Sequence, residues 1–439
     1  MPRSLSLLLL AFFLLGCEPP TAPPPKLTPP PAAGSTTGHD SVVQPVQPDA
    51  EPKTEIKESY GGKTPILDPV ANVLPSADIA AGWIALFDSE SLFGWKANTD
   101  LNWRVEDGVI LADEGKPGLL QTTSRFADYE LRCDFRVAPG GNSGIFLRSA
   151  FIPTDPATDC YELNICDTHP MFKSGSLVKR AQPMKEITAD GEWHTFHVRA
   201  EGPQIVVKFD GEEILTYTDD TPTPIASGHI GLQMNGGKAE FKNVYLKPLG
   251  TKPLFDGASL EGWRVVPGSQ SQFEVLDETI HVTGGRGFLE TEATARNFVF
   301  QFEAKTNGDK LNSGVFFRAL PGTEAEPSNG YEFQIQNGFK DNDRTKPEDF
   351  GTGAIFRRIA ARKVVSNDRE WLFATLIADG PHFATWVNGI SVVDWTDDRE
   401  PHENPRNGLR LDAGHFSLQG HDPGTDLHFR NLRLIALPE

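Results

Sequence analysis

Apolar and polar residues alternate with a period of two along most of this chain. Segments such as YELRCDFRV (129–137), QIVVKFD (204–210) and YEFQIQ (331–336) are short and rich in β-branched and aromatic residues. Gly, Asp, Asn and Pro separate them, as is typical of strands joined by turns. Helical periodicity is hard to find. Successive side chains of a strand point to opposite faces, so the pattern predicts an all-β protein of many antiparallel strands.

The pattern occurs twice. LFDSESLFGW (86–95) returns as LFDGASLEGW (254–263), an offset of 254 − 86 = 168. NSGIFLR (142–148) returns as NSGVFFR (312–318), at 312 − 142 = 170, and GHIGLQ (228–233) as GHFSLQ (414–419), at 414 − 228 = 186. The offset grows in steps, as expected for copies that differ by loop insertions. We predict two tandem jelly-roll β-sandwiches of the concanavalin A-like kind, at residues 79–249 and 250–439, each with a concave face.

The N-terminal part of the chain has a different character. Residues 1–17 combine a basic start, a short apolar core and the sequence Leu14-Leu15-Gly16-Cys17, which resembles a bacterial lipobox. The resemblance implies cleavage and lipidation at Cys17, and the alternative is an ordinary secretory signal. Residues 18–78 are rich in Pro, Ser, Thr and Gly with few aliphatics, which predicts a disordered tether. The expected location is the periplasmic or outer-membrane face of a bacterial membrane, with the lipid as the membrane contact.

Charge and motif content limit the partners. The formal net charge is −19, which argues against a nucleic-acid or anionic-membrane partner, because either would require clustered Lys and Arg. Neutral ligands such as sugars remain compatible. No paired Cys-x-x-Cys spacing predicts a zinc site, and no dinucleotide or phosphate-loop fingerprint predicts a nucleotide cofactor. We therefore expect no cofactor and no metal.

Strand parity gathers polar residues on one face of the second repeat. Glu332 and Gln334 alternate with apolar residues in one strand, and His415, Ser417, Gln419 and His421 do so in another. In the SGVFFR strand, Arg318 is expected on the same side as Gly314. A wet face is common in any sheet, but the first repeat keeps polar residues at three matching positions: Arg148, Glu162 and Gln233. Their recurrence favours a functional surface.

These motifs together resemble a known family. The SG[IV]F[LF]R strand, the YE-x-[QN]-I strand, the E-W and [DN]-G hairpin and the closing LQ-x-[HN] strand followed by F-[KR]-N are similar to the 3-keto-disaccharide hydrolase domain family. The resemblance covers nearly all of residues 80–439 as two copies. It implies cleavage of sugars oxidised at C3, where the ketone acidifies the C2 proton so that the C1 substituent can leave and water can add.

Such chemistry needs a base near C2, a donor for the enolate oxygen and help for the leaving oxygen. The resemblance implies that His421 or Glu332 is the base and that Arg318 stabilises the enolate. The base and acid roles stay open between His421 and Glu332. The expected substrate-binding residues are Gln334, Gln419 and Asp422 in the second repeat and Arg148, Glu162 and Gln233 in the first.

The two copies differ at the candidate site. His421 is matched by Asn235, and an amide cannot act as a base near neutral pH. The first repeat has Asp167 and His169 after its YELNI strand instead, so either repeat could react, and we favour the second. A carbohydrate-binding lectin-like protein and a structural surface protein on the same scaffold are the alternatives, because fold does not decide activity.

Overall fold

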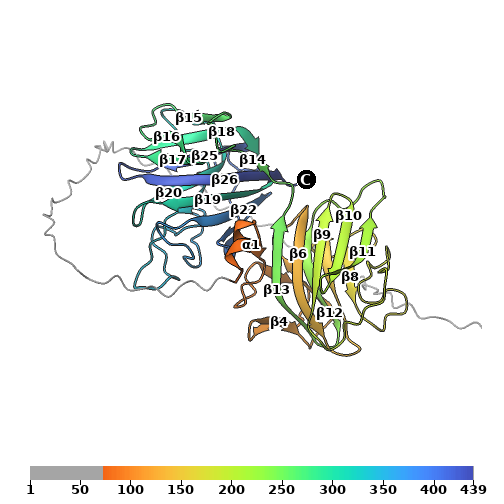
Figure 1. Ribbon diagram of the computed structural model, residues 1–439. Coiled ribbons are helices and arrows are strands. Elements are labelled where there is room, and N and C mark those ends of the chain that lie inside the picture. The colour runs from red at the N-terminus through yellow and green to blue at the C-terminus, as the bar shows by residue number, and fades with distance from the viewer. Residues whose placement is uncertain (1–72, 439) are drawn as a thin grey trace, which may run out of the picture. The chain divides into compact units, whose positions relative to one another are not determined.

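The computed structural model describes residues 73–438 of the chain (Figure 1). The predicted signal peptide with Cys17 and most of the predicted tether lie outside these residues. Within them the protein is almost entirely β, with one short helix, α1 (Ser76–Ala80). No helix in this part of the chain has the length and apolarity needed to cross a membrane. Four antiparallel sheets form two sandwiches, as the period-two pattern and the repeats predicted.

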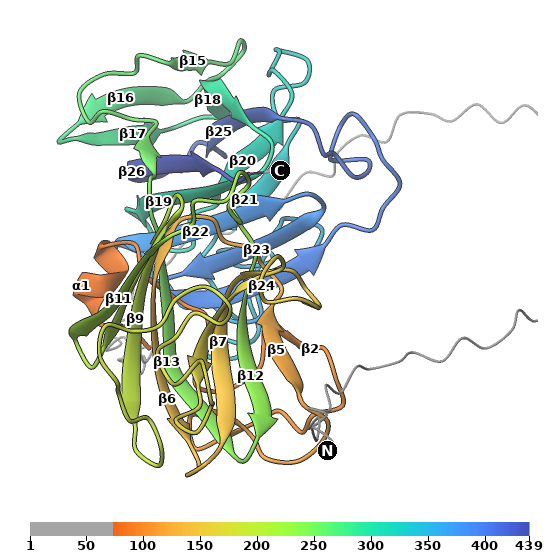
Figure 2. The same ribbon diagram turned by 90° about the vertical axis from the view of Figure 1, so that its right-hand side faces the viewer.

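The first sandwich pairs an eight-stranded sheet with a five-stranded one. The larger sheet has the order β11-β10-β9-β6-β13-β4-β3, with β1 on β13, and the smaller has the order β2-β5-β12-β7-β8 (Figure 2). Its strands are β1 (Ile84–Ala85), β2 (Trp95–Ala97), β3 (Arg104–Glu106), β4 (Val109–Ala112), β5 (Gly118–Thr122), β6 (Tyr129–Val137), β7 (Asn142–Ser149), β8 (Tyr161–Ile165), β9 (His194–Glu201), β10 (Gln204–Phe209), β11 (Glu212–Thr218), β12 (His229–Gly236) and β13 (Ala239–Pro248).

The second sandwich repeats this topology. Its eight-stranded sheet has the order β16-β17-β26-β19-β22-β23-β24, with β14 on β26, and its five-stranded sheet has the order β15-β18-β25-β20-β21. The strands are β14 (Lys252–Pro253), β15 (Trp263–Val265), β16 (Gln272–Leu276), β17 (Thr279–Thr283), β18 (Gly287–Ala295), β19 (Phe298–Thr306), β20 (Ser313–Ala319), β21 (Tyr331–Ile335), β22 (Leu372–Asp379), β23 (His382–Val387), β24 (Ile390–Thr396), β25 (Gly414–Gly420) and β26 (Asp426–Ala436).

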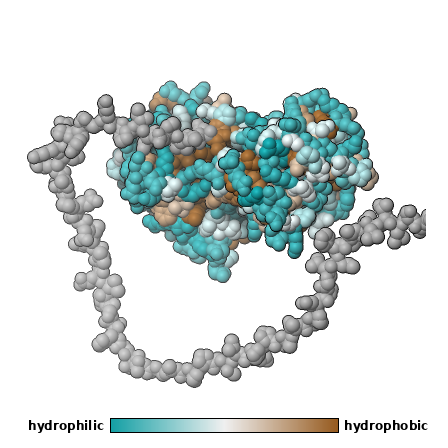
Figure 3. Space-filling model, turned by 90° about the horizontal axis from the view of Figure 1, so that it is seen from below, coloured by the Kyte–Doolittle hydropathy of each residue, from teal (hydrophilic) through white to brown (hydrophobic). Residues whose placement is uncertain are grey.

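Each sandwich buries its core between its two sheets. In β6 the alternation places Leu131, Cys133 and Phe135 inside, each fully buried, and Phe300 and Phe302 of β19 have the same position in the second copy. All three cysteines in the described residues are free and buried, so disulfides do not link these sheets. The outer surface is mainly hydrophilic with scattered apolar patches (Figure 3), in keeping with the acidic composition.

The two sandwiches share apolar contacts. Trp386 of β23 belongs to the core cluster of the first repeat and donates its indole N–H to the Ala85 carbonyl at 2.9 Å. The Arg125 guanidinium makes two hydrogen bonds to Asp379, at 2.6 and 2.9 Å. Burial of an aromatic side chain across this junction contributes more than the partly exposed ion pair. Trp386 therefore is one of the apolar anchors between the copies, beside Val299, Ile377 and Ala384 of the same cluster.

Candidate active site

A cavity of about 770 Å³ opens on the five-stranded sheet of the second sandwich. Strands β21 and β25 supply its floor, and the loops around them supply its walls. Three of the predicted residues, Glu332, Gln419 and His421, line it together. The other lining residues are Arg286, Asn312, Ala325, Glu326, Pro327, Ser328, Asn329, Asp349, Phe356, Arg357 and Arg406.

Glu332 is the buried acid of this cavity. It sits on β21 opposite Phe316 of β20, with only 7% of its side chain exposed. Gly314, two residues before Phe316, makes room for it, because a Cβ there would lie 2.9 Å from Glu332 Oε1. Burial raises the pKa of Glu332 to about 7, and the nearby Asp349 carboxylate adds to the rise. A carboxylate of this pKa can take and return a proton near neutral pH.

His421 follows β25 and is held by its neighbour. Its Nδ1 lies 2.9 Å from Asp422 Oδ2, and this hydrogen bond lowers the pKa of Asp422. The Asp422 backbone N–H in turn donates to Thr425 Oγ1, which fixes the turn. His421 Nε2 makes no hydrogen bond with any residue in 73–438, so it is available to a ligand. Asp422 does not line the cavity and acts through His421.

The two predicted glutamines have different environments. Gln419 is 8% exposed, lines the cavity, and its buried Oε1 has no hydrogen-bond partner among the described residues. An unsatisfied buried amide oxygen in a cavity wall is suited to a ligand hydroxyl. Gln334 is fully buried, and its Nε2 donates to Asp349 Oδ2 at 3.1 Å. It therefore positions Asp349 on the cavity wall, contrary to the expectation of direct substrate contact.

Three guanidinium groups at the cavity were missed by the sequence reasoning. Arg406 Nη2 lies 3.6 Å from Glu332 Oε2, and Arg286 and Arg357 complete the set. Arg406 is held by a hydrogen bond from its Nε to the Ser328 carbonyl at 2.8 Å. The repeat offset shows where two of them come from. GEW (191–193) returns as REW (369–371), at 369 − 191 = 178, so the offset rises by 178 − 170 = 8 between β21 and β22. It rises again by 186 − 178 = 8 between β24 and β25, and these two segments contain Arg357 and Arg406.

The prediction that Arg318 stabilises an enolate is not supported. Arg318 has φ = 46° at a register shift in β20, so its side chain leaves the face of Phe316. It is 0% exposed and donates to the carbonyls of Arg296, Gly380 and Arg410. Its guanidinium nitrogens all donate hydrogen bonds to oxygens of the protein, and Arg318 does not line the cavity.

Arg148 has the same structural role in the first repeat, with φ = 47° and hydrogen bonds to the carbonyls of Ala127, Gly202 and Ile225. Its predicted substrate contact is likewise wrong. Recurrence of this arginine therefore reflects architecture: it ties one sheet to the loops that close the sandwich.

The candidate residues of the first repeat make hydrogen bonds with other residues of the protein. Gln233 Nε2 donates to Glu162 Oε1 at 3.3 Å, and burial raises the pKa of Glu162. Asp167 accepts hydrogen bonds from Ser174 and from the backbone of residues 189 and 190. His169 Nδ1 accepts the backbone N–H of Phe172 at 2.8 Å. Asp167 and His169 therefore stabilise loops, whereas the buried Oε1 of Gln233, like that of Gln419, has no hydrogen-bond partner among the described residues. Asn235, the counterpart of His421, is exposed.

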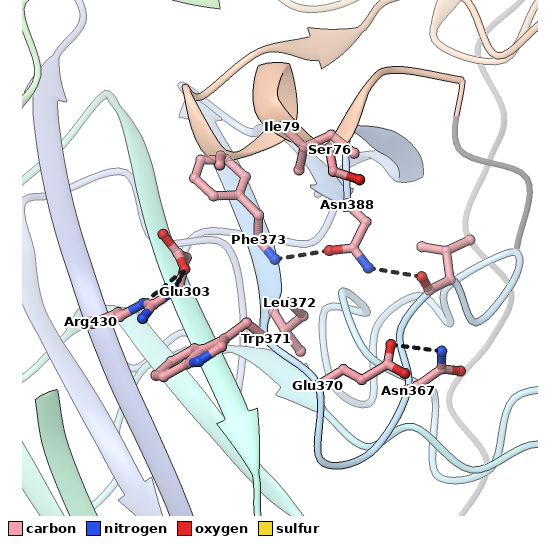
Figure 4. Close-up of a pocket in the computed structure, with 12 residues that line it drawn as sticks. Ser76, Ile79, Glu303, Asn367, Glu370, Trp371, Leu372, Phe373, Asn388 and Arg430 are labelled. Carbon is pink, nitrogen blue, oxygen red and sulfur yellow. Dashed lines mark hydrogen bonds and ion pairs between the residues drawn. The ribbon is translucent and has the colours of Figure 1, made fainter. Parts of the chain in front are cut away.

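A second cavity, of about 450 Å³, lies between α1 and the outer face of the second sandwich (Figure 4). Its polar groups are already paired. Glu303 accepts from Arg430 at 2.8 Å, and Asn388 accepts from the Phe373 backbone at 2.9 Å. The Arg430 guanidinium stacks on Trp371, with 3.9 Å to the ring centroid. This cavity offers no ionisable group comparable with Glu332.

Comparison with known proteins decides the family. The model of the 3-keto-alpha-glucoside-1,2-lyase-like domain matches the chain twice, at residues 82–247 and 250–435. The chain belongs to this family. This member of the 3-keto-alpha-glucoside-1,2-lyase-like family is also similar to a 3-keto-disaccharide hydrolase of Bacteroides thetaiotaomicron. The two sequences are 24% identical over 236 residues, and the match covers 39% of this chain and 79% of the relative.

Two solved structures are also similar to this family member. One is a candidate glycosyl hydrolase from Parabacteroides distasonis, with 22% identity and a TM-score of 0.36, covering 41% of this chain and 99% of that one. The other is the carbohydrate-binding module CBM66 from Bacillus subtilis, with 17% identity and a TM-score of 0.27, covering 35% of this chain and 95% of that one.

Proposed function

We propose that the second repeat cleaves glycosides whose sugar has been oxidised to a ketone at C3. The observation that carries this proposal is a buried carboxylate, Glu332, with its pKa raised to about 7, in a cavity that also contains guanidinium groups and an imidazole. The family supports a hydrolase or lyase of this class, and the 3-keto-disaccharide hydrolase relative supports the substrate.

Glu332 is the proposed general base. It takes the C2 proton, and the electron pair of the broken C–H bond forms the enolate with the C3 ketone. The enolate then expels the C1 substituent, leaving an enone. Addition of water to the enone completes a net hydrolysis, and release of the enone itself would make the reaction a lyase. The raised pKa suits the role, because a base poised near the working pH has both the correct ionisation and a useful affinity for the proton.

His421 is the proposed acid for the departing oxygen. Protonated at Nε2, it donates this proton to the glycosidic oxygen as the C1–O bond breaks. Asp422 accepts the Nδ1–H at 2.9 Å and so fixes the orientation of the ring. This assignment divides the base and acid roles that the sequence left open.

Arg406 and its neighbours Arg357 and Arg286 take the role that the sequence gave to Arg318. Negative charge develops on the C3 oxygen when the C2 proton leaves, and a preorganised cation beside the base stabilises it. Arg406 Nη2 lies 3.6 Å from Glu332 Oε2, and its Nε is fixed by the Ser328 carbonyl. The free Oε1 of Gln419 is suited to orient a sugar hydroxyl.

The lining also bears on the lectin alternative. Sugar-binding sites usually present an aromatic platform on which a ring stacks. Phe356 is the one aromatic residue that lines this cavity besides the His421 imidazole, whereas ten of the fourteen lining residues carry a charge, an imidazole or a carboxamide. Ionisable groups around a shared space favour catalysis over simple binding.

The test compares two matched glutamate variants of the full chain. The protein is incubated with a 3-keto-disaccharide and with its unoxidised parent, and products are followed by mass spectrometry. We expect cleavage of the ketone alone, a loss of at least about 100-fold in Glu332→Gln, and normal turnover in Glu162→Gln of the first repeat. Binding without cleavage of either sugar would instead favour the lectin function, and loss in Glu162→Gln alone would move the active site to the first repeat.

We further propose that the enzyme is exported and anchored by a lipid on Cys17. The proposal rests on the sequence of residues 1–17, which lie outside the described structure. Radiolabelled palmitate should label the wild-type chain expressed in a bacterium, and Cys17→Ser should abolish the label. An unlabelled wild-type chain that is secreted would leave the ordinary signal peptide as the explanation.

A further inference from the structure

A cluster of metal-ligating side chains lies on the outer face of the second sandwich, on the sheet opposite the active-site cavity. Strands β17 and β26 pair so that His281 lies directly opposite His428, while Ile280 and Phe429 face the core. Asp426 precedes His428 by two residues and shares its face. One ligand atom from each of His281, Asp426 and His428 lies within 4.8 Å of the other two.

The hydrogen bonds around His428 fix its tautomer. Thr279 Oγ1 donates its single proton to the Leu276 carbonyl at 2.7 Å. It must therefore accept at its other contact, from His428 Nδ1–H at 2.8 Å. A neutral His428 then carries its lone pair on Nε2.

His281 also has a hydrogen-bond acceptor beside its Nδ1. Its Nδ1 lies 3.3 Å from Glu274 Oε1, an acceptor for an Nδ1–H. Its Nε2 lies 2.9 Å from Asp426 Oδ1, a contact that Nε2–H makes as a hydrogen bond in the metal-free protein and that a bound cation would replace. Histidines that bind metals commonly donate their second N–H to a carboxylate or other oxygen in this manner.

We propose that His281, His428 and Asp426 bind a divalent transition metal of the zinc class. Two imidazole nitrogens and a carboxylate oxygen are ligands that zinc accepts, with a fourth position left for water. The rings stack at 4.2 Å between centroids with planes 5° apart. Tetrahedral ligands at bonds of about 2.1 Å stand roughly 3.4 Å apart. Small side-chain rotations about the cross-strand pair therefore close the site.

The first repeat lacks these ligands. The register that pairs His281 with His428 pairs Leu111 with Glu240 in the first sandwich. Lys238 stands where the second repeat has Asp426, and its ammonium binds Glu240 at 2.8 Å. The second repeat therefore has two histidines and an aspartate where the first has an ion pair, so these three residues are not part of the framework that the two copies share.

The experiment measures zinc binding to the full chain without a polyhistidine tag, by titration calorimetry, with cobalt absorption as a second readout of ligand geometry. We expect one site per chain that His428→Ala and His281→Ala each weaken at least about tenfold, with unchanged circular dichroism. Two control variants should bind as the wild type does: His197→Ala, on the outer face of the first sandwich, and His421→Ala, in the cavity.

Two results would overturn the proposal. One is a wild-type chain that binds no zinc at about 100 µM metal near neutral pH. The other is loss of binding in His421→Ala with full binding in His428→Ala, which would place the ion in the active-site cavity. Because the readout is binding of the metal alone, the result does not depend on whether the chain cleaves 3-keto-glycosides.

Discussion

The Glu332 carboxylate lies 3.6 Å from the Arg406 guanidinium, yet the pKa of Glu332 is raised to about 7. Opposite charges at hydrogen-bonding distance would normally lower it. Here the separation is long, the carboxylate is buried, and desolvation exceeds the attraction. Burial also lowers the pKa of Arg406, so both members of the pair are held in a site that disfavours charge. Glu332 is therefore a stronger base than an exposed carboxylate, because burial disfavours its charged form more than Arg406 favours it.

The pH profile of turnover follows from this pair. Glu332 must be ionised to remove a proton, so kcat/KM should rise as the pH increases through about 7. Arg406 lowers the pKa of Glu332, and Arg406→Met should therefore move this rise to higher pH as well as reduce the maximum rate. Initial rates measured from pH 5 to pH 9 give both quantities. A rise at the same pH in both proteins would show that another group controls the profile.

Burial of Glu332 should also cost stability. Its folded pKa, about 7, lies above the ordinary value of 4.5, so the stability present below about pH 4.5 is lost as the pH rises through 7. Glu332→Gln removes this loss of stability at high pH, because glutamine does not ionise. The difference in unfolding free energy between variant and wild type should therefore increase by up to about 3 kcal/mol from pH 4 to pH 8. Urea denaturation at the two pH values measures it, and a constant difference would contradict the raised pKa.

Replacing Arg318 should lower stability, whereas replacing Arg286 should lower activity. Arg318→Met leaves three buried carbonyls without their donor, which should cost about 3 kcal/mol or more. Arg286 lines the cavity and is exposed, so Arg286→Met should change stability by less than about 0.5 kcal/mol while reducing kcat/KM. Thermal unfolding and initial rates test the pair. A stable but inactive Arg318→Met chain would return this residue to the site.

Trp386 should control the junction between the repeats. Trp386→Ala removes a buried indole from the core cluster of the first repeat and breaks its hydrogen bond to Ala85, at a cost of about 3–5 kcal/mol. The half-buried Trp371, on the outer face, is the matched control and should cost less. Limited proteolysis should cut Trp386→Ala faster between the repeats. Equal cutting rates in the two variants would mean that other contacts hold the junction.

The position of the Glu332 carboxylate depends on one glycine. A Cβ at position 314 would lie 2.9 Å from Glu332 Oε1 and 3.0 Å from its Cγ, so Gly314→Ala must displace the carboxylate. We expect a fall in kcat of at least about tenfold with a small loss of stability. The equivalent Gly144→Ala in the first repeat, where Glu162 Cγ would be 3.6 Å away, is the control and should leave turnover unchanged.

Strand parity placed some site residues correctly and others wrongly, and the difference has a local cause. Glu332, Gln419 and His421 lie in or just after regular strands, where alternation predicts the face of each side chain. Arg318 lies at a register shift with a positive φ, which turns its side chain away from that face. A bulge shifts the alternation of side chains by one residue, and nothing in the sequence marks where it occurs. Strand alternation therefore predicts the wrong face for a residue at the bulge.

The sequence by itself determined the all-β architecture, the tandem sandwiches and the family, because these follow from local periodicity and from motif order repeated along the chain. The tertiary structure alone decided which charged groups surround Glu332 and which recurring arginines serve the framework. It also brought His281 beside Asp426 and His428, far apart in sequence, on neighbouring strands. The physical reason is that a pKa and a ligand site depend on burial and distances across strands and inserted loops, and sequence spacing does not encode these.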